Sequence, residues 1–270
     1  MRPAWRDTAI GLLLPALLLL LWHVVVQQGW ASPQALPAPA AVARKWLEYL
    51  LPQQPFGGGN WLAWACSGEL PRDAAASLAR VLAGFAIGAA LALPLGLAMG
   101  ASTRAYRLLN VLVQVLRPVP PIAYIPLAML WFGLGNAPAV FLIALGAFFP
   151  VLVNTIAGVR QVDGIYLRAA RNLGAGGATL FRRVILPAAM PAILAGARIG
   201  IGTAFIVVIV AEMVAVNNGL GFRISEAREY FWSDKIIAGM ASIGLLGLAI
   251  DTGMDRLNRH LLRWHRGLEH

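Results

Sequence analysis

The sequence is poor in the residues that most often build metal and nucleotide sites. Its single cysteine, Cys66, excludes a disulfide within the chain and a cluster of thiolate ligands. The two lysines, Lys45 and Lys235, follow Arg and Asp, so no Gly-Lys-Ser/Thr motif for nucleotide phosphates is present. We therefore expect no cofactor, no metal and no ATPase site in this chain. The histidines lack the spacing of metal ligands and are His23, His260, His265 and His270.

Charged side chains are also scarce, and this scarcity sets the class of protein. They make up 13% of the 270 residues, against about 25% in an average soluble domain. Hydrophobic residues make up 59%, and apolar runs of roughly 20 residues, the length that crosses a bilayer, recur. The sequence therefore predicts an all-α membrane protein. Its six transmembrane helices are expected at about 9–27, 77–100, 106–132, 137–159, 190–216 and 235–262.

The net charge of +10 fits arginines at the ends of membrane spans, so nucleic acid is not an expected partner. With the N-terminus placed inside, the cytoplasmic segments hold thirteen basic residues. The outside segments, which include Arg72 and Arg80, hold seven. This asymmetry predicts a multi-pass protein of the bacterial plasma (inner) membrane with both termini in the cytoplasm.

The chain divides into two expected regions. Residues 1–76 hold a first span, read as retained and not as a cleaved signal peptide, and an outside loop. Residues 77–265 form a five-helix core that includes a cytoplasmic loop at 160–189. Residues 268–270, Leu-Glu-His, are read as a tag remnant and are left out of the fold.

The outside loop contains one amphipathic stretch, PAAVARKWLEYLL, at 39–51. Val42, Trp46 and either Tyr49 or Leu50 share a face at helical spacing. Arg44 is expected to pair with Glu48 four residues later. We predict a helix that lies on the outer membrane surface.

Glycines that recur four residues apart predict close packing of helices. Packing within the membrane domain is the favoured interpretation, and a subunit interface stays open as the alternative. The pairs are Gly84 and Gly88, Gly96 and Gly100, and Gly196 and Gly200.

The predicted cytoplasmic loop carries a short basic helix. Asp163 is a good N-cap and Gly174 a good residue just past the helix C-terminus. Thr179 is expected to cap a second short helix that Pro187 ends. Two readings stay open: a docking surface for an acidic partner, or an interfacial helix whose arginines reach the headgroups. The expected docking surface has apolar and small residues flanked by arginines, namely Ile165, Ala169, Leu173, Arg168 and Arg171.

This loop resembles the cytoplasmic loop of ABC importer permeases. The family pattern is Glu-Ala-Ala, three residues, Gly, nine residues, Ile, one residue and Leu-Pro. The spacing is met throughout, with Arg in place of Glu and Val in place of Ile. Arg168 in place of Glu changes a negative charge to a positive one, so an arginine–glutamate contact of the family does not carry over to this position. The matching residues are Arg168, Ala169, Ala170, Gly174, Val184, Leu186 and Pro187.

Further stretches resemble the subgroup that imports taurine, alkanesulfonates and nitrate. They are LPAPAAV (36–42), SGEL (67–70), LRPVPPIAYIPLAMLWFGLG (116–135), LPAAMPAILAGARIGIG (186–202), VAEM (210–213) and GLGF (219–222).

This resemblance implies a type I ABC importer (MetI-like) permease fold. It also implies a small anion as substrate, with taurine or another sulfonate first and nitrate or bicarbonate next. The implied partners are a second copy, two ABC ATPase subunits that hold ATP and Mg²⁺, a periplasmic or lipid-anchored binding protein, and membrane lipid. The implied ATPase-docking residues are Arg168, Ala169, Ala170, Arg171, Gly174, Leu186 and Pro187.

Candidates for the substrate path come from residues that disturb an apolar run. RPVPPIAYIP, 117–126, has four prolines inside an expected span, which fits either a kinked packing helix or a broken helix along a passage. Glu212 is the one acid well inside an apolar run, for which an ion pair within the protein is favoured over substrate contact. The path or gate candidates are Arg117, Pro120, Pro121, Tyr124, Asn154 and Glu212.

Two other functions are weaker fits. A secondary transporter that needs no ATP would be expected to show repeated halves and several carboxylates at mid-membrane. An intramembrane enzyme would need a nucleophile with a base, or a metal constellation. Neither pattern is visible in the sequence.

Overall fold

A computed structural model describes residues 4–52, 54–58 and 60–262. The expected tag remnant at 268–270 lies outside these residues. Across the described ranges the protein is built from helices, without a strand. η1 is a 3₁₀ helix and η2 a π helix. The elements are α1 (Ala4–Gln27), α2 (Pro39–Leu50), α3 (Trp61–Ala65), α4 (Glu69–Ala101), α5 (Thr103–Leu116), η1 (Pro121–Tyr124), α6 (Ile125–Phe132), α7 (Asn136–Arg160), α8 (Gly164–Asn172), α9 (Gly177–Leu180), η2 (Phe181–Ile185), α10 (Leu186–Ala215), α11 (Leu220–Glu229) and α12 (Ser233–Leu261).

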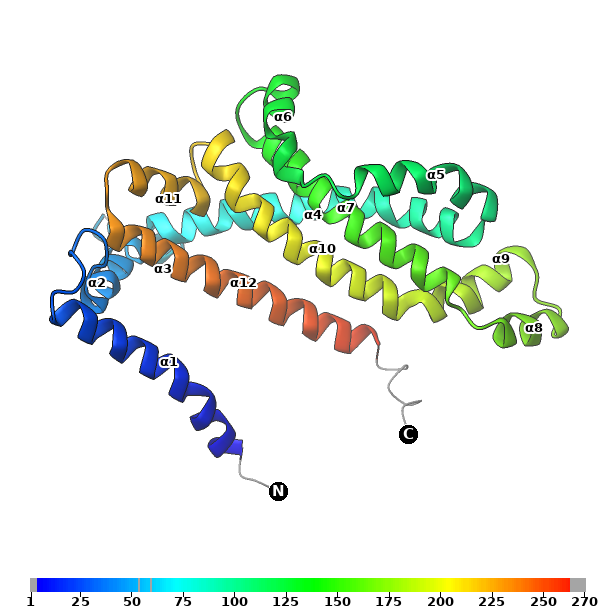
Figure 1. Ribbon diagram of the computed structural model, residues 1–270, viewed down its shortest axis with the longest axis horizontal. Helices are drawn as coiled ribbons and strands as arrows, with labels where there is room; N and C mark the ends of the chain where they lie inside the picture. Colours follow the sequence, from blue (N-terminus) through cyan, green and yellow to red (C-terminus); the bar gives the residue numbers. More distant parts are fainter. Residues whose placement is uncertain (1–3, 53, 59, 263–270) are drawn as a thin grey trace.

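The all-α fold is confirmed, but the expected number of spans is not matched. Within the described residues, 4 helices are long and apolar enough to cross a membrane, namely α4, α7, the continuous Gly177–Ala215 and α12. A bent pair of helices raises the count to 5, and Leu13–Gln27 of α1 is a shorter apolar helix. The long helices run side by side (Figure 1). α8 and α9 lie at one end of this bundle, the α8 end, and α2, α3 and α11 lie at the other, the α11 end (Figure 1).

The centre of the bundle is α7, which packs against α4 and α10. Glycines permit this close packing. A Cβ built on Gly84 of α4 would lie 2.5 Å from Cγ2 of Ile143, and one built on Gly196 of α10 would lie 2.5 Å from Cβ of Asn154. The predicted glycine pairs therefore pack within one chain, which confirms the favoured interpretation.

The third expected span, 106–132, is not one helix. α5 ends at Leu116, and η1 with α6 leaves at an angle of 82°. Proline removes backbone donors and clashes with the preceding helical turn, so the proline-rich segment from Pro118 to Pro121 breaks the chain here. α6 consequently stands away from the direction of the long helices (Figure 1).

The helix predicted at 39–51 is present as α2, with two corrections. Its apolar face packs on protein: Val42 and Tyr49 are buried, and Nε1 of Trp46 donates to Oγ of Ser242 on α12 at 2.9 Å. Glu48 pairs with Lys45 at 3.0 Å and not with the predicted arginine. This hydrogen bond to Glu48 raises the pKa of Lys45. α2 is therefore a part of the bundle's α11 end.

Candidate functional site

The predicted α8 helix is present, with the predicted signals at both ends. Oδ1 of Asp163 accepts a hydrogen bond from the N–H of Ile165 at 2.8 Å. Gly174 has φ +84°, a conformation that favours glycine. The N–H of Ala175 donates to the carbonyl of Ala170 at 2.9 Å across this glycine, as in a Schellman motif. α8 is thus a defined helix fixed at both ends.

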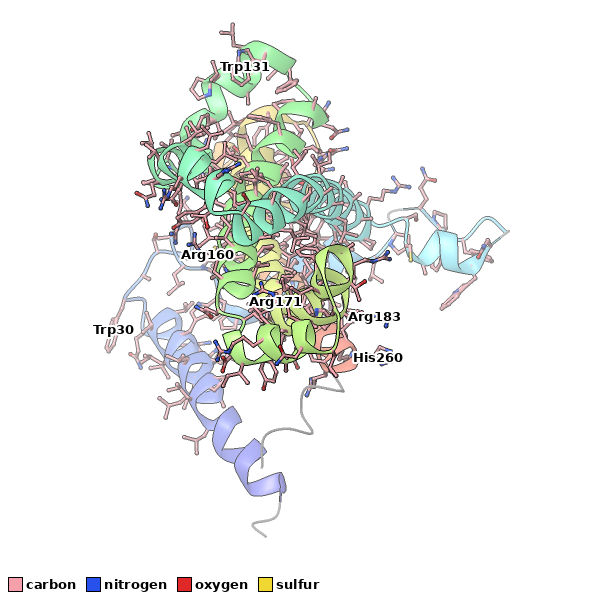
Figure 2. The ribbon with its side chains drawn as sticks, turned by 90° about the vertical axis from the view of Figure 1, so that its right-hand side faces the viewer. Trp30, Trp131, Arg160, Arg171, Arg183 and His260 are labelled. Carbon is pink, nitrogen blue, oxygen red and sulfur yellow. The ribbon has the colours of Figure 1, made fainter. Side chains whose placement is uncertain are left out.

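The outer surface of α8 is apolar and basic, and it is open. Ile165 and Tyr166 are exposed, and Leu173 is 87% exposed. Ala169, Arg168 and Arg171 are exposed as well. α8 makes its main contacts with α9 and η2. Figure 2 looks at the α8 end and shows Arg160, Arg171 and Arg183 there. An exposed apolar surface with basic neighbours is suited to contact with another protein.

The remainder of the insert differs from the prediction. Gly176, and not Thr179, is the N-cap of α9. Pro187 does not end a helix, because α9, η2 and α10 continue from Gly177 to Ala215. Pro187 lies in the first turn of α10 after the π turn, where the helix accommodates a missing N–H. Leu186 is half-buried and packs near Val159 at the base of the insert.

Four of the six path candidates meet at one cleft of about 290 Å³. The cleft lies between the α5–η1 break, α7 and α10. Nδ2 of Asn154 donates to the carbonyl of Pro150 at 2.8 Å, so this amide also serves its own helix. The break in the third span therefore lines a cavity that holds one guanidinium group. The four candidates are Arg117, Pro120, Pro121 and Asn154, and α10 contributes Ile199 and Thr203.

The other two candidates lie elsewhere. Tyr124 packs against the buried core between α7 and α10. Glu212 is buried farther along α10, towards the α11 end. Its Oε1 lies 2.6 Å from Nη1 of Arg80, and its Oε2 accepts from Oγ of Ser77 at 2.8 Å. The ion pair predicted for Glu212 is present, and its partner Arg80 is one of the basic residues that the charge count places with the outside segments.

The sequence contained a signal for this partner. Asp73, Ser77 and Arg80 are spaced four and three residues apart, which places them on one face of a helix. α4 begins at Glu69 and not at residue 77, so all three lie within it and are buried. The polar side chains in the first turns of α4 interrupt the apolar pattern, so the hydropathy of the sequence does not predict that the helix begins as early as Glu69.

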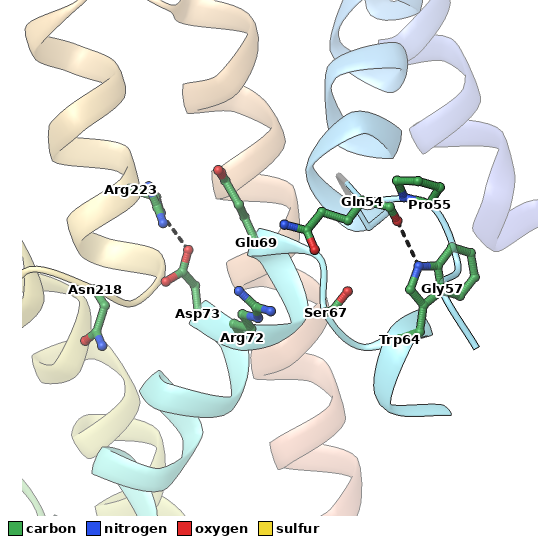
Figure 3. A pocket seen from close by; sticks show the side chains of 10 residues that line it. All are labelled: Gln54, Pro55, Gly57, Trp64, Ser67, Glu69, Arg72, Asp73, Asn218 and Arg223. Carbon is green, nitrogen blue, oxygen red and sulfur yellow. Dashed lines mark hydrogen bonds and ion pairs between the residues drawn. The ribbon is translucent and has the colours of Figure 1, made fainter. Parts of the chain in front are cut away.

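Asp73 organises a second polar cluster at the α11 end. Its carboxylate accepts from the hydroxyl of Tyr49 at 2.9 Å, from the N–H of Gly219 at 2.9 Å and from Nε of Arg223 at 2.7 Å. Burial, together with the adjacent Asp73 carboxylate, raises the pKa of Tyr49. A pocket of about 660 Å³ lies beside this cluster, with Arg72 on its wall (Figure 3). The cluster joins α2, α4 and α11.

Residues 84–267 match the model of a family described as the binding-protein-dependent transport system inner membrane component. The chain belongs to this family. It is 35% identical over 263 residues to the taurine transport system permease protein TauC of Escherichia coli, covering 97% of this chain and 92% of that one. It is 32% identical to the bicarbonate transport system permease protein CmpB of Synechococcus elongatus, covering 96% and 92%.

The fold of this permease is also similar to a chain of the MetNI methionine ABC transporter in an inward facing conformation. The TM-score is 0.62 at 22% identity, over 71% of this chain and 95% of that one. The MetI-like permease fold implied by the loop pattern is therefore confirmed. The protein is a membrane-spanning permease of an ABC importer.

Proposed function

We propose that this permease carries a small anion into the cytoplasm, with taurine or another sulfonate first and nitrate or bicarbonate next. The similarity to TauC and to CmpB supports an anion. The cleft supports it too, because Arg117 is on its wall. Within the described part of the chain, no hydrogen bond or salt bridge engages the guanidinium of Arg117, whose backbone N–H donates to the carbonyl of Val113. Such a guanidinium is available to a sulfonate, a nitrate or a carboxylate.

The working assembly in this proposal has two copies of the chain, two ABC ATPase subunits that hold ATP and Mg²⁺, and an external binding protein. The α8 end and both termini are cytoplasmic, which agrees with the excess of basic residues in these segments. The observation that carries this proposal is the open surface of α8, with Leu173 exposed and Arg171 beside it. A groove with acidic groups on the ATPase would complement it.

The helix that follows α8 gives a path for the motion. Gly177–Ala215 is one continuous helix, and its residues Ile199 and Thr203 line the cleft. A displacement of the docked insert is therefore passed along α10 to the cleft. The ATPases close on ATP, the insert moves, and the cleft opens alternately to the two sides of the membrane.

The test is co-purification of the permease with its ATPase after substitution on α8. We expect Ala169→Glu to remove the ATPase, because a carboxylate then stands in the contact surface. Ala101→Glu is the matched control, since Ala101 is an exposed residue of α4 at the same end of the bundle. Normal ATPase binding and normal uptake by Ala169→Glu would contradict the docking assignment.

A second measurement addresses the energy source and the substrate. Proteoliposomes with permease, ATPase and binding protein should take up labelled taurine only with ATP. The degree to which unlabelled nitrate or bicarbonate reduces the uptake of labelled taurine then ranks the anions as substrates. Full uptake by the permease alone, without nucleotide, would favour a secondary transporter.

A further inference from the structure

A further cluster of ion pairs joins α10 to α12. Nε and Nη2 of Arg198 donate to Oδ1 and Oδ2 of Asp251, both at 2.9 Å. Nη1 of Arg198 lies 3.7 Å from Oδ1 of Asp255. Asp255 is shared with Arg259, its neighbour one turn later on α12. Two cations and two carboxylates therefore form a group without net charge.

Arg198 lies within the α10 span, and its partner Asp251 lies where the apolar part of α12 ends. Arg198 is 12 residues from the start of α10 at Leu186, which is about 18 Å along a helix. Asp251 directly follows the apolar stretch 236–250 of α12, and the ten residues after it include Asp255, Arg256 and Arg259. A charged group at the depth of Arg198 usually faces the interior of a bundle or a water-filled cavity, because hydrocarbon does not solvate it.

The cluster is nevertheless open on one side. The side chains of Arg198, Asp251 and Asp255 are 43%, 56% and 36% exposed. The buried pair of Arg80 and Glu212 is 6% and 0% exposed. The two ion pairs thus differ in kind: one is enclosed by protein, and the other is accessible on the surface of the single chain.

The open stripe of α10 leads from this cluster to the cleft. Successive residues of a helix are separated by about 100°, so Arg198 and Ile199 lie at the two edges of this stripe, and Ile199 lines the cleft. Gly202 lies between these two residues on the helix surface, one turn later, because it follows Ile199 by three residues and Arg198 by four. A Cβ built on Gly202 would meet no atom within 4 Å. The exposed residues of this stripe are Ala195, Arg198, Ile199, Gly202 and Ile206.

We infer that Arg198 contacts the transported anion in the cytoplasmic half of the path, and that Asp251 holds its guanidinium when no anion is present. This inference rests on the proposed function. A sulfonate, a nitrate or a bicarbonate offers the paired oxygens that a guanidinium binds. The arriving anion exchanges with the Asp251 carboxylate, and the return of Asp251 releases the anion to the cytoplasm. Arg117 in the cleft is the preceding cation on this path.

The alternative is a clamp that only attaches α12 to α10. A charge swap separates the two, because Arg198→Asp with Asp251→Arg keeps the ion pair and moves the cation to the other helix. We expect the swap to restore the thermal stability that Arg198→Asp loses, while uptake stays about tenfold or more below the wild type, the equivalent of one lost charged hydrogen bond. Recovery of wild-type uptake by the swap would overturn the inference in favour of the clamp.

A second variant keeps the test decisive if the swap does not fold. Asp251→Asn leaves the Arg198 charge and removes the nearer of its two carboxylate partners, at 2.9 Å against 3.7 Å for Asp255. We expect uptake by this variant to be inhibited from the cytoplasmic side at an about tenfold lower concentration of the transported anion. Unchanged inhibition would overturn the inference, since a clamp gives no reason for tighter binding.

All variants are compared in complexes that co-purify with the ATPase as the wild type does. A wild type that binds no ATPase, or takes up no anion with ATP, contradicts the proposed function. A normal wild type with unaffected variants contradicts only the role of Arg198.

Discussion

Nη1 of Arg80 and Oε1 of Glu212 are 2.6 Å apart, and this contact joins α4 to α10 inside the protein. The carboxylate is fully engaged, since its second oxygen accepts from Ser77 and from the N–H of Gly221 at 3.0 Å. The guanidinium also donates from Nε to Oδ1 of Asn136 at 2.7 Å. Removing one partner of such a buried ion pair destabilises a protein strongly, because the other charge is left buried without a counterion.

The first prediction concerns this pair. We expect Glu212→Gln to destabilise the permease by about 3–5 kcal/mol, because the Arg80 charge stays buried without its counterion. Replacing both residues with leucine should cost less than Glu212→Gln alone, since no charge is then left behind. Thermal unfolding in detergent measures both, with Lys45→Gln at an exposed pair as the control. Equal effects of all three changes would show that the pair is not a structural joint.

The second prediction is a dependence on alkaline pH. The neutral hydroxyl of Tyr49 donates to Asp73, and burial raises the pKa of this phenol. A raised pKa in the folded state means that this stabilisation is complete below the tyrosine's unfolded pKa of about 10 and is lost as the pH rises above it.

The unfolding temperature of the wild type should therefore fall between about pH 9 and 11. Tyr49→Phe should be less stable at neutral pH by about 1 kcal/mol and should show a smaller fall. Parallel curves for the two proteins would exclude Tyr49 as the cause.

The third prediction tests the packing of α10 on α7. Gly196→Ala would place a Cβ 2.5 Å from Cβ of Asn154 and 3.1 Å from the carbonyl oxygen of Pro150. Such overpacking costs about 1–3 kcal/mol. Gly244→Ala on α12 is the control, because a Cβ there meets nothing within 4 Å and alanine favours a helix. The unfolding temperatures of the two variants should move in opposite directions.

The features that were predictable from the sequence are local ones. The caps of α8 at Asp163 and Gly174 depend on the residues next to them, and both are found. The shared face of Val42 and Tyr49 follows from helical spacing alone. The loop pattern up to Pro187 indicates the family without knowledge of the fold.

The features that were not predictable depend on distant pairing or on competition between neighbours. Arg80 and Glu212 are 132 residues apart, and no local pattern connects them. Lys45 pairs with Glu48 in place of the adjacent arginine, and it lies at a pocket that Glu69 and Asp234 from other helices also line. Four prolines at 117–126 indicated a disturbed helix, but these residues alone do not give the angle of 82° between α5 and the helices that follow it.

The last prediction concerns the transmission of motion through η2. Arg182 and Arg183 are exposed residues of this π segment, within the continuous helix from Gly177 to Ala215. Replacing both with glycine loosens the helix, since each glycine costs about 1 kcal/mol relative to alanine in a helix interior. Replacing both with alanine removes the same charges and keeps the helix stiff, so it is the matched control.

If a displacement of α8 reaches the cleft through this helix, the glycine variant hydrolyses ATP but takes up less anion per ATP than the alanine variant. The ratio of uptake to ATP hydrolysis in proteoliposomes measures this directly. A loss shared by both variants would instead assign the effect to the two charges. An equal, undiminished ratio in both would mean that the motion reaches the cleft by another element, with α7 as the next to test because it too ends at the insert.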